Sequence, residues 1–336
     1  MPKTAPSRTY QLQDQFFNKL KDVINPKLSF VDEIAEVLGI SKDSVYRRLR
    51  SETSLSLEEI ILLSEHFKVS FDLNEKQSKG VVTFGYGSIK NQDDFKNYLK
   101  RIITDLSQIV SSEQKRVTYA ANDVPVFHHF KYHNLTAFKV FYWLKGVVND
   151  PSLMGKQFDM SLIDPEIFDL TKDVYNAYIN TPSREIWTAE TINSQIEQIK
   201  YYWESGLFGT QEQALLASSE LIESVETLKH FVDHASKLDA SQQQNLEFYF
   251  SEIEIGNNTI MVERGSEKTL YLSFNSFNSM MTMNPDFCEE VDDWMENLIK
   301  KSVLISGVSE KMRYQFFNKI FNKLNALKRG IEENVI

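Results

Sequence analysis

The sequence predicts a mainly α-helical protein with a smaller β component, built from an N-terminal all-α domain and a C-terminal α+β region. Its 336 residues exceed what one typical hydrophobic core organises, so we expect two domains. Only 12 Gly and 8 Pro interrupt the chain, which favours long helices. A hydrophobic content of 42% excludes wholesale disorder. The predicted domains are residues 1–75 and 81–336, joined by a polar connector that begins at Asp72.

Charge is distributed unevenly between these two parts. The formal net charge is −10, yet the first 70 residues carry ten Lys or Arg and ten Asp or Glu, so the rest of the chain holds the whole negative excess. Within the neutral part, residues 41–50 contain four basic side chains and one acidic side chain. A local positive spot on an acidic molecule suits selective DNA binding, because non-specific attraction to phosphates stays weak.

The absence of disulfide, secretory and membrane-span features predicts the cellular compartment. Its single cysteine, Cys288, cannot form an internal disulfide, and no apolar segment of a secretory signal precedes the first predicted helix. No apolar run is long enough for a membrane span. We therefore expect a cytoplasmic protein with no membrane partner.

Short helices with clear boundary signals fill the N-terminal part. Residues 11–24 are amphipathic, and the helix should stop near Asn25-Pro26. Ser29 opens a second helix, with Asp32 three residues later as in a capping box. The residues of that helix that recur at helical spacing and should be buried are Val31, Ile34, Ala35 and Leu38.

A tight turn and a third helix follow. Gly39 stands where a left-handed residue closes the second helix. Ser41 caps a helix through Arg50, in which Val45 and Leu49 are four apart and face inward. A fourth helix opens with the capping box of Ser56 and Glu59, and its predicted apolar side consists of Leu57, Ile60, Ile61, Leu63 and Phe67.

The stretch from residue 31 to residue 72, VDEIAEVLGISKDSVYRRLRSETSLSLEEIILLSEHFKVSFD, resembles the helix-turn-helix of the XRE, or Cro/cI-like, repressor superfamily. Ala35 stands where the first helix must be small, Gly39 at the tight turn, and Val45 at the buried position of the recognition helix. Arg48 departs from the pattern, which has an apolar residue there, and we expect Leu49 to take that packing role. The resemblance implies a transcription regulator whose partner is double-stranded DNA.

The outward side of the third helix carries the candidate DNA contacts. In this motif the N-terminal part of the recognition helix enters the major groove. The resemblance assigns base reading to Lys42, Asp43 and Arg47; an arginine can pair with guanine, and an aspartate can accept from the cytosine amine. The residues expected at the DNA backbone or beside the base-reading positions are Ser41, Tyr46, Arg50, Ser51 and Thr53. The alternative is a solvated basic face on a helical adaptor that binds another protein.

Beyond residue 80 the sequence predicts helices and fewer strands. A hairpin is expected around Gly256-Asn257-Asn258, whose residue types favour a tight turn. Residues 180–194, which include Trp187, are interpreted as capping and anchoring a helix. Strands are expected at 115–123, 246–255, 259–265 and 268–274, and helices at 95–112, across most of 126–237, at 286–302 and at 309–329.

This larger region is expected to sense a ligand or to dimerise. An aromatic-rich α+β module can enclose a small-molecule pocket, although the same residues serve equally as ordinary core. The expected partners are therefore a second copy of the chain, giving a homodimer, and a candidate small-molecule effector whose identity the sequence does not specify.

No motif for catalysis or for a cofactor stands out. The sequence has no phosphate-binding loop, nucleophile elbow or zinc-protease motif. His129 with His133 and His230 with His234 are each four apart, as in helical metal pairs, but neither pair has a third ligand on its face. We expect no catalytic residues, no metal and no cofactor, and thus no enzyme. An enzyme with a DNA-binding head is the third interpretation.

Overall fold

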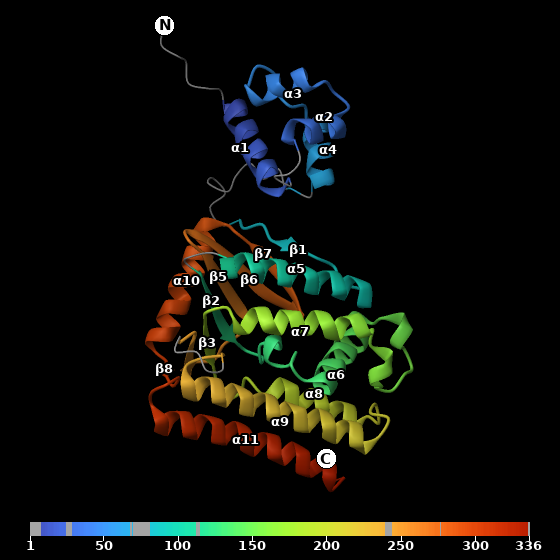
Figure 1. Cartoon of the computed structure of the whole chain (residues 1–336), viewed down its shortest axis with the longest axis vertical. Coiled ribbons are helices and arrows are strands. Elements are labelled where there is room, and N and C mark those ends of the chain that lie inside the picture. Colours follow the sequence, from blue (N-terminus) through green and yellow to red (C-terminus); the bar gives the residue numbers. More distant parts are fainter. Residues whose placement is uncertain are drawn as a thin grey trace. The chain divides into compact units, whose positions relative to one another are not determined.

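The structure, a computed structural model, describes residues 8–24, 29–67, 69, 81–111, 115–238, 244–275 and 277–334. The chain divides into two compact units, Met1–Val81 and Val82–Ile336. Helices account for 59% and strands for 14%, which confirms the predicted mainly α fold with a smaller β component. The predicted domain limits at 75 and 81 stay a prediction, because residues 70–80 lie outside the described residues. Figure 1 shows the elements in sequence colours.

The N-terminal unit is a small bundle of helices around one apolar core. The core joins Phe17 of the first helix, Ile34 of the second, Val45 of the third and Leu63 of the fourth, all buried. Because each helix contributes one stripe of apolar side chains, the bundle leaves its polar faces to solvent. The bounds are α1 (Arg8–Val23), α2 (Phe30–Leu38), α3 (Lys42–Leu49) and α4 (Leu57–Phe67).

Two local predictions for this unit need correction. Ser29 stands at the N-cap of α2, but its side chain makes no capping hydrogen bond, and its backbone carbonyl accepts from the Asp32 N–H instead. Leu57 and Ile61, predicted on the apolar side of α4, are exposed, Leu57 by 72%. The core is reached by Leu63, with Ile60 packed beside it, because only one stripe of an α-helix can face the bundle.

The C-terminal unit is organised by a mixed sheet. The strands of the described residues form one eight-stranded sheet in the order β1-β7-β6-β5-β2-β3-β4-β8. Its centre, β2-β3-β4, is parallel, and all other neighbours pair antiparallel. The strand bounds are β1 (Gly85–Tyr86), β2 (Lys115–Ala121), β3 (Ser183–Trp187), β4 (Leu246–Phe250), β5 (Thr259–Arg264), β6 (Glu267–Asn275), β7 (Asn278–Thr282) and β8 (Val303–Leu304).

Helices cover both faces of this sheet, as Figure 1 shows. On one face, Tyr119 of β2 and Phe248 of β4 join the large core formed with most of the helices. On the other face, Ala120 and Ile186 pack with α10. This alternation follows from the period of two along a strand, which sends neighbouring side chains to opposite faces. The helix bounds are α5 (Gln92–Ser111), α6 (His133–Trp143), α7 (Pro165–Ile179), α8 (Asn193–Glu204), α9 (Gln211–His234), α10 (Pro285–Lys300) and α11 (Glu310–Glu332).

The predicted hairpin around Gly256-Asn257-Asn258 is wrong. β4 pairs with β3 and β8, whereas β5 pairs with β2 and β6, so the two flanking strands are not neighbours. The two-residue hairpin turn lies instead between β5 and β6, at Gly265 and Ser266, and Gly265 has the positive φ of 58° that such turns need. Asn257 and Asn258 belong to a longer connection at the edge of the sheet, where the Asn257 side chain donates to the Ser273 carbonyl.

Residues 183–187, predicted to cap a helix, form the central strand β3 instead. All five are buried, although Arg184 and Glu185 are charged. Arg184 is paired with Glu296 of α10, and the Glu185 carboxylate accepts from His128, Tyr178 and Trp187. Because these partners come from distant segments, the strand satisfies its polar groups in a way that local sequence does not reveal.

Within the described residues, no helix is both long and apolar enough to span a lipid bilayer.

Candidate nucleic-acid interface

The turn between α2 and α3 has the geometry that the sequence predicts. Gly39 adopts φ 64° and ψ 31°, the left-handed conformation that favours glycine. The N–H of Ile40 then donates to the carbonyl of Ala35 at 3.1 Å, as in a Schellman motif. This closes α2 within one residue and turns the chain directly into α3.

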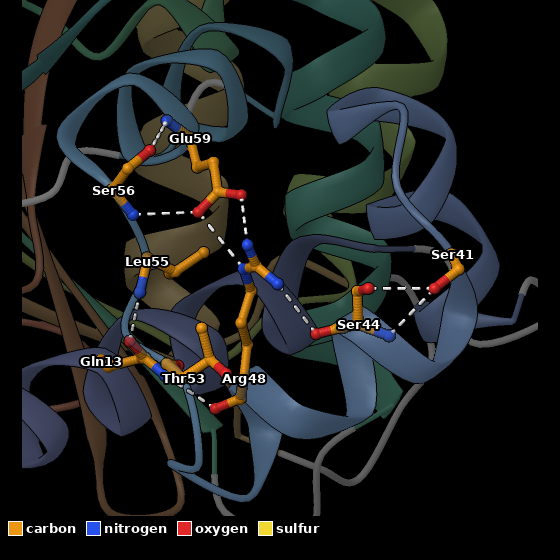
Figure 2. A network of polar contacts seen from close by, with 8 residues as sticks. All are labelled: Gln13, Ser41, Ser44, Arg48, Thr53, Leu55, Ser56 and Glu59. Carbon is orange, nitrogen blue, oxygen red and sulfur yellow. Dashed lines mark hydrogen bonds and ion pairs between the residues drawn. The ribbon is translucent and has the colours of Figure 1, made fainter.

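Ser41 begins the recognition helix. Its Oγ accepts from the backbone N–H of Ser44 at 3.3 Å, and the two serine hydroxyls lie 2.9 Å apart (Figure 2). The hydroxyl thus satisfies one of the free N–H groups of the first helical turn. The Ser41 prediction is confirmed as a helix cap, while its role at the DNA backbone stays a prediction.

The outward residues of α3 lie where helical spacing puts them. Val45 is fully buried and Leu49 packs against the core, so the opposite side of the helix is free. The residues of that side that are exposed are Lys42, Asp43, Tyr46 and Arg47, and Arg50 is exposed directly after the helix. The structure therefore brings the predicted base-reading residues together on one solvent-facing surface, which we call the α3 face.

Each cation of the α3 face has an acidic partner in the same unit. Lys42 Nζ lies 2.7 Å from an Asp32 oxygen, and Arg47 Nε lies 3.1 Å from an Asp43 oxygen. The hydrogen bond to Asp32 raises the pKa of the Lys42 ammonium and keeps Lys42 charged. All these side chains are about half exposed or more, so the pairs are weak and can exchange for other anions.

Arg50 completes this set. Its Nε lies 3.4 Å from Glu52 and also donates to the Tyr46 carbonyl at 3.3 Å. The α3 face is consequently close to neutral in itself, and a phosphate must compete with three carboxylates for its cations. Sequence counting of basic residues overstated its positive charge.

Ser51 and Thr53, in the loop after α3, make contacts with α1 that the sequence did not predict. Ser51 has a positive φ of 58°, and its hydroxyl donates to Asp14 of α1 at 3.2 Å. Thr53 is exposed, and its carbonyl accepts from Gln13 at 3.0 Å. Both contacts fix the loop after α3 against α1, while the predicted phosphate contacts of both residues stay predictions.

The sequence identifies Arg48 as a departure from the family pattern and Leu49 as the packing residue, which does pack against the core, but it does not predict the partner of Arg48. Its guanidinium donates to both carboxylate oxygens of Glu59 on α4, at 2.7 and 3.2 Å, and to the Ser44 carbonyl at 3.0 Å (Figure 2). Its side chain is only 15% exposed and that of Glu59 17%. Arg48 therefore fills the position usually taken by an apolar residue, with its charge neutralised, and is directed away from the α3 face.

Glu59 has a second function in the same network. Its carboxylate accepts from the Ser56 N–H at 2.9 Å, and the Glu59 N–H donates to the Ser56 hydroxyl at 3.1 Å, which confirms the predicted capping box. Buried Gln13 of α1 accepts from the Leu55 N–H and donates to the Arg48 carbonyl (Figure 2). These hydrogen bonds tie α1, α3 and α4 together, so the α3 face is held on a rigid support.

The histidine pairs do not form a metal-binding arrangement. His129 follows the short 3₁₀ helix Val126–His128, whereas α6 begins at His133, so these two histidines do not share a helix. His234 Nδ1 lies 2.8 Å from the His230 carbonyl on α9. In the part of the chain that the structure describes, no group of three His, Cys, Asp or Glu side chains could hold a metal ion.

Comparison with known families agrees with this geometry. The model of the helix-turn-helix family HTH_3 matches residues 31–74, which span α2, the turn, α3 and α4. Searches of the curated proteins and of the solved structures return no match. The N-terminal region is thus an XRE-type helix-turn-helix, and the family relationship supports a DNA-binding regulator of transcription.

Proposed function

Because residues 31–74 belong to the HTH_3 helix-turn-helix family, we propose that this protein is a sequence-specific transcription regulator that reads operator DNA with α3. Arg47 and Lys42 contact base edges in the major groove, with Asp43 accepting from a cytosine amine. Arg50, Ser41, Tyr46, Ser51 and Thr53 contact the backbone or flank the reading positions. A regulator of this kind must reach chromosomal DNA, so we also propose a cytoplasmic location.

One observation carries this proposal. The side chains of α3 that face solvent are polar and mostly charged, while the inward ones are apolar or neutralised, as with Val45 and Arg48. The C-terminal unit is proposed to bring two copies together or to sense a ligand, without a catalytic role.

The test is selection of DNA by the purified full-length chain. Sheared genomic fragments retained by the protein are sequenced, and the enriched motif is then used for affinity measurements. Arg47→Ala should weaken the selected site by about 1–3 kcal/mol and relax preference at one base pair. Arg50→Ala should weaken all sequences alike and reduce the salt slope by about one.

The second candidate function is a protein-binding adaptor, which the exposed apolar residues of α4 favour. Leu57, Ile61 and Leu62 are 72%, 47% and 43% exposed. If this surface rather than the α3 face is the functional one, no DNA motif is enriched, and Arg47→Ala behaves as wild type in every DNA assay.

A further inference from the structure

A small cavity in the C-terminal unit lies at the end of the sheet where β2 stops. Its volume is about 50 Å³, and it lies among the ends of β2, β5, β6 and β7, with α5 and α6 above. Most cavities of this size are filled by water or left as packing defects, so the polar groups that line it decide whether it is a site.

The first of these groups is Lys139 of α6. It is 6% exposed, and its Nζ makes one hydrogen bond within the described part of the chain, to Gln198 at 2.6 Å. An ammonium has three N–H donors, so two remain for a group inside the cavity. Burial lowers the pKa of Lys139, and the negative charge of Asp123 offsets part of that lowering.

The second group is the Asp123 carboxylate, which lines the same cavity. Gln195 donates to one of its oxygens, and the Ser194 hydroxyl donates to the other at 3.4 Å. A carboxylate can accept about four hydrogen bonds, so acceptor capacity remains. Among the described residues, Asp123 and Lys139 line the same cavity without forming an ion pair with each other.

Helix α8 links these two charges through a chain of hydrogen bonds. Gln198 accepts from Lys139 and donates to Ser194 at 2.9 Å, and Ser194 in turn donates to Asp123. The cavity therefore has a positive group and a negative group in its lining, each partly satisfied by the same helix. Lys139 is buried and Asp123 is half-buried, so the ammonium is the costlier of the two charges unless a group of opposite polarity lies beside it.

We propose that this cavity binds a small zwitterionic amino acid, whose carboxylate accepts from Lys139 and whose ammonium donates to Asp123. A simple anion would meet repulsion from Asp123, and a simple cation would meet repulsion from Lys139, whereas a zwitterion satisfies both. Tyr98, Tyr119 and Ser273, whose hydroxyls can donate and accept hydrogen bonds, also line this cavity.

The size of the cavity restricts the ligand. One water-sized atom needs about 10–15 Å³ of cavity volume, so a cavity of about 50 Å³ holds about three to five heavy atoms. Glycine, with five heavy atoms, fits this range, and alanine, with six, is the next larger α-amino acid. Phe127 and Phe277 form an apolar wall that suits a hydrogen or a methyl side chain and leaves no room for a larger one. As an effector site this cavity rests on the proposed regulatory function, but ligand binding itself does not depend on it.

The test is calorimetric titration of the full-length protein with glycine and L-alanine, without DNA. Acetate, methylammonium and L-phenylalanine serve as probes that carry only the anion, only the cation, or a side chain that is too large. Glycine or alanine should bind at least about tenfold more tightly than any of the three. Equal binding of acetate and glycine, or no binding of either amino acid, overturns the proposal.

Variants separate the two charges from general damage to the fold. Asp123→Asn should weaken glycine binding about tenfold or more without weakening acetate, and Lys139→Met should abolish both. Ser273→Val, which narrows the cavity and leaves both charges in place, should also block glycine if Lys139→Met does not fold. Glu197→Gln removes an exposed charge from α8 outside the cavity and should bind as wild type. Unchanged glycine binding in Asp123→Asn overturns the assignment.

The outcome is independent of DNA recognition. If Arg47→Ala behaves as wild type towards DNA while glycine still binds, the proposed function fails and the cavity stands. If DNA is selected but no amino acid binds, the reverse holds.

Discussion

The Arg48 guanidinium and the Glu59 carboxylate form a two-point ion pair that fixes α3 against α4, with contacts of 2.7 and 3.2 Å. The pair is mostly buried, and the same carboxylate caps α4 through Ser56. Removing one partner of such a pair leaves an uncompensated charge in the interior. The orientation of the α3 face therefore depends on a residue of α4 that does not belong to it.

We expect Glu59→Gln to destabilise the N-terminal unit by about 2 kcal/mol, because it leaves Arg48 unpaired and weakens the cap. Hydrogen exchange of the α3 amides in the full-length chain measures this as faster local opening. Glu58→Gln, which changes an exposed neighbour in the same turn, is the control. Equal protection of α3 in the two variants would argue against a structural role for the pair.

The helix-turn-helix could be read from the sequence because its signals are local. Gly39, Ser41 and Val45 act on neighbours within a few residues, through a left-handed turn, a cap and a helical stripe. Arg48 could not be assigned in this way, because its partner Glu59 is eleven positions on and on another helix. The family resemblance predicted a packed residue at position 48, but it did not predict an arginine that is neutralised by an ion pair.

The sheet was less predictable for the same reason. β3 contains Arg184 and Glu185, which local patterns place at a surface, and its neighbours β2 and β4 lie more than 50 residues away in either direction. Gly256, Asn257 and Asn258 are residue types that favour turns. Whether a turn forms a hairpin depends, however, on whether the two strands beside it pair with each other. Lys139 and Asp123 likewise share one cavity through tertiary packing, with Gln198 and Ser194 of α8 hydrogen-bonded between them.

The acidic partners of the α3 face give a second prediction. Asp32→Asn releases Lys42 from its ion pair, so affinity for non-specific DNA should rise about twofold to fivefold at low salt. The difference should disappear at high salt, because exposed charges are then screened. Fluorescence anisotropy with a DNA duplex of random sequence measures both. Glu36→Gln, the control, changes an exposed acid of α2 that forms no ion pair with the described residues of the α3 face. A rise of the same size in this variant would show only a general charge effect.

The last helix provides a test of burial. Phe317 is 1% exposed and packs on Phe316 with ring centroids 5.1 Å apart, whereas Phe321 is only partly buried. Phe317→Ser should cost about 3–5 kcal/mol and lower the melting temperature, and Phe321→Ser should cost less. Tyr314→Ser on the same helix, at a side chain 66% exposed, is the matched control. A melting temperature unchanged in Phe317→Ser would contradict packing of this face.

Buried Lys237 predicts a pH dependence of stability. Its Nζ donates to the carbonyls of Tyr178 and Thr181 and to the Ser183 hydroxyl, yet burial lowers its pKa from 10.5 to about 7. Between those two values the unfolded chain binds more protons than the folded chain, so the free energy of unfolding should rise as the pH rises from about 7 towards 10. Below about 7 both states are protonated, and this contribution becomes constant.

Lys237→Met should remove that slope. Urea unfolding at a series of pH values gives the free energy of unfolding of the wild type and of the variant. In the difference between these two free energies, the contributions of the other titratable groups largely cancel. Lys229→Met, which loses a partly exposed ammonium paired with Asp233, is the control and should leave the slope unchanged. If the difference in free energy of unfolding between wild type and Lys237→Met does not change between pH 7 and 10, the Lys237 ammonium stays charged throughout this range.

The final prediction is that residues 1–75 alone bind the selected operator poorly and that the rest of the chain supplies the affinity. Lys42, Arg47 and Arg50 each face a carboxylate, so few counterions are released when one head binds DNA. One recognition helix also reads only a few base pairs, and regulators of this type place two heads on half-sites about one helical turn apart. Tethering the second head raises avidity by roughly 10²–10⁴ without a new contact. The acidic C-terminal unit is unsuited to phosphate contacts, so we expect it to contribute by holding two heads together. The affinities of residues 1–75 and of the full-length chain for one operator are compared by fluorescence anisotropy, while light scattering gives the mass of the full-length chain. Equal affinities, or tight binding by a full-length monomer, would rule out this arrangement.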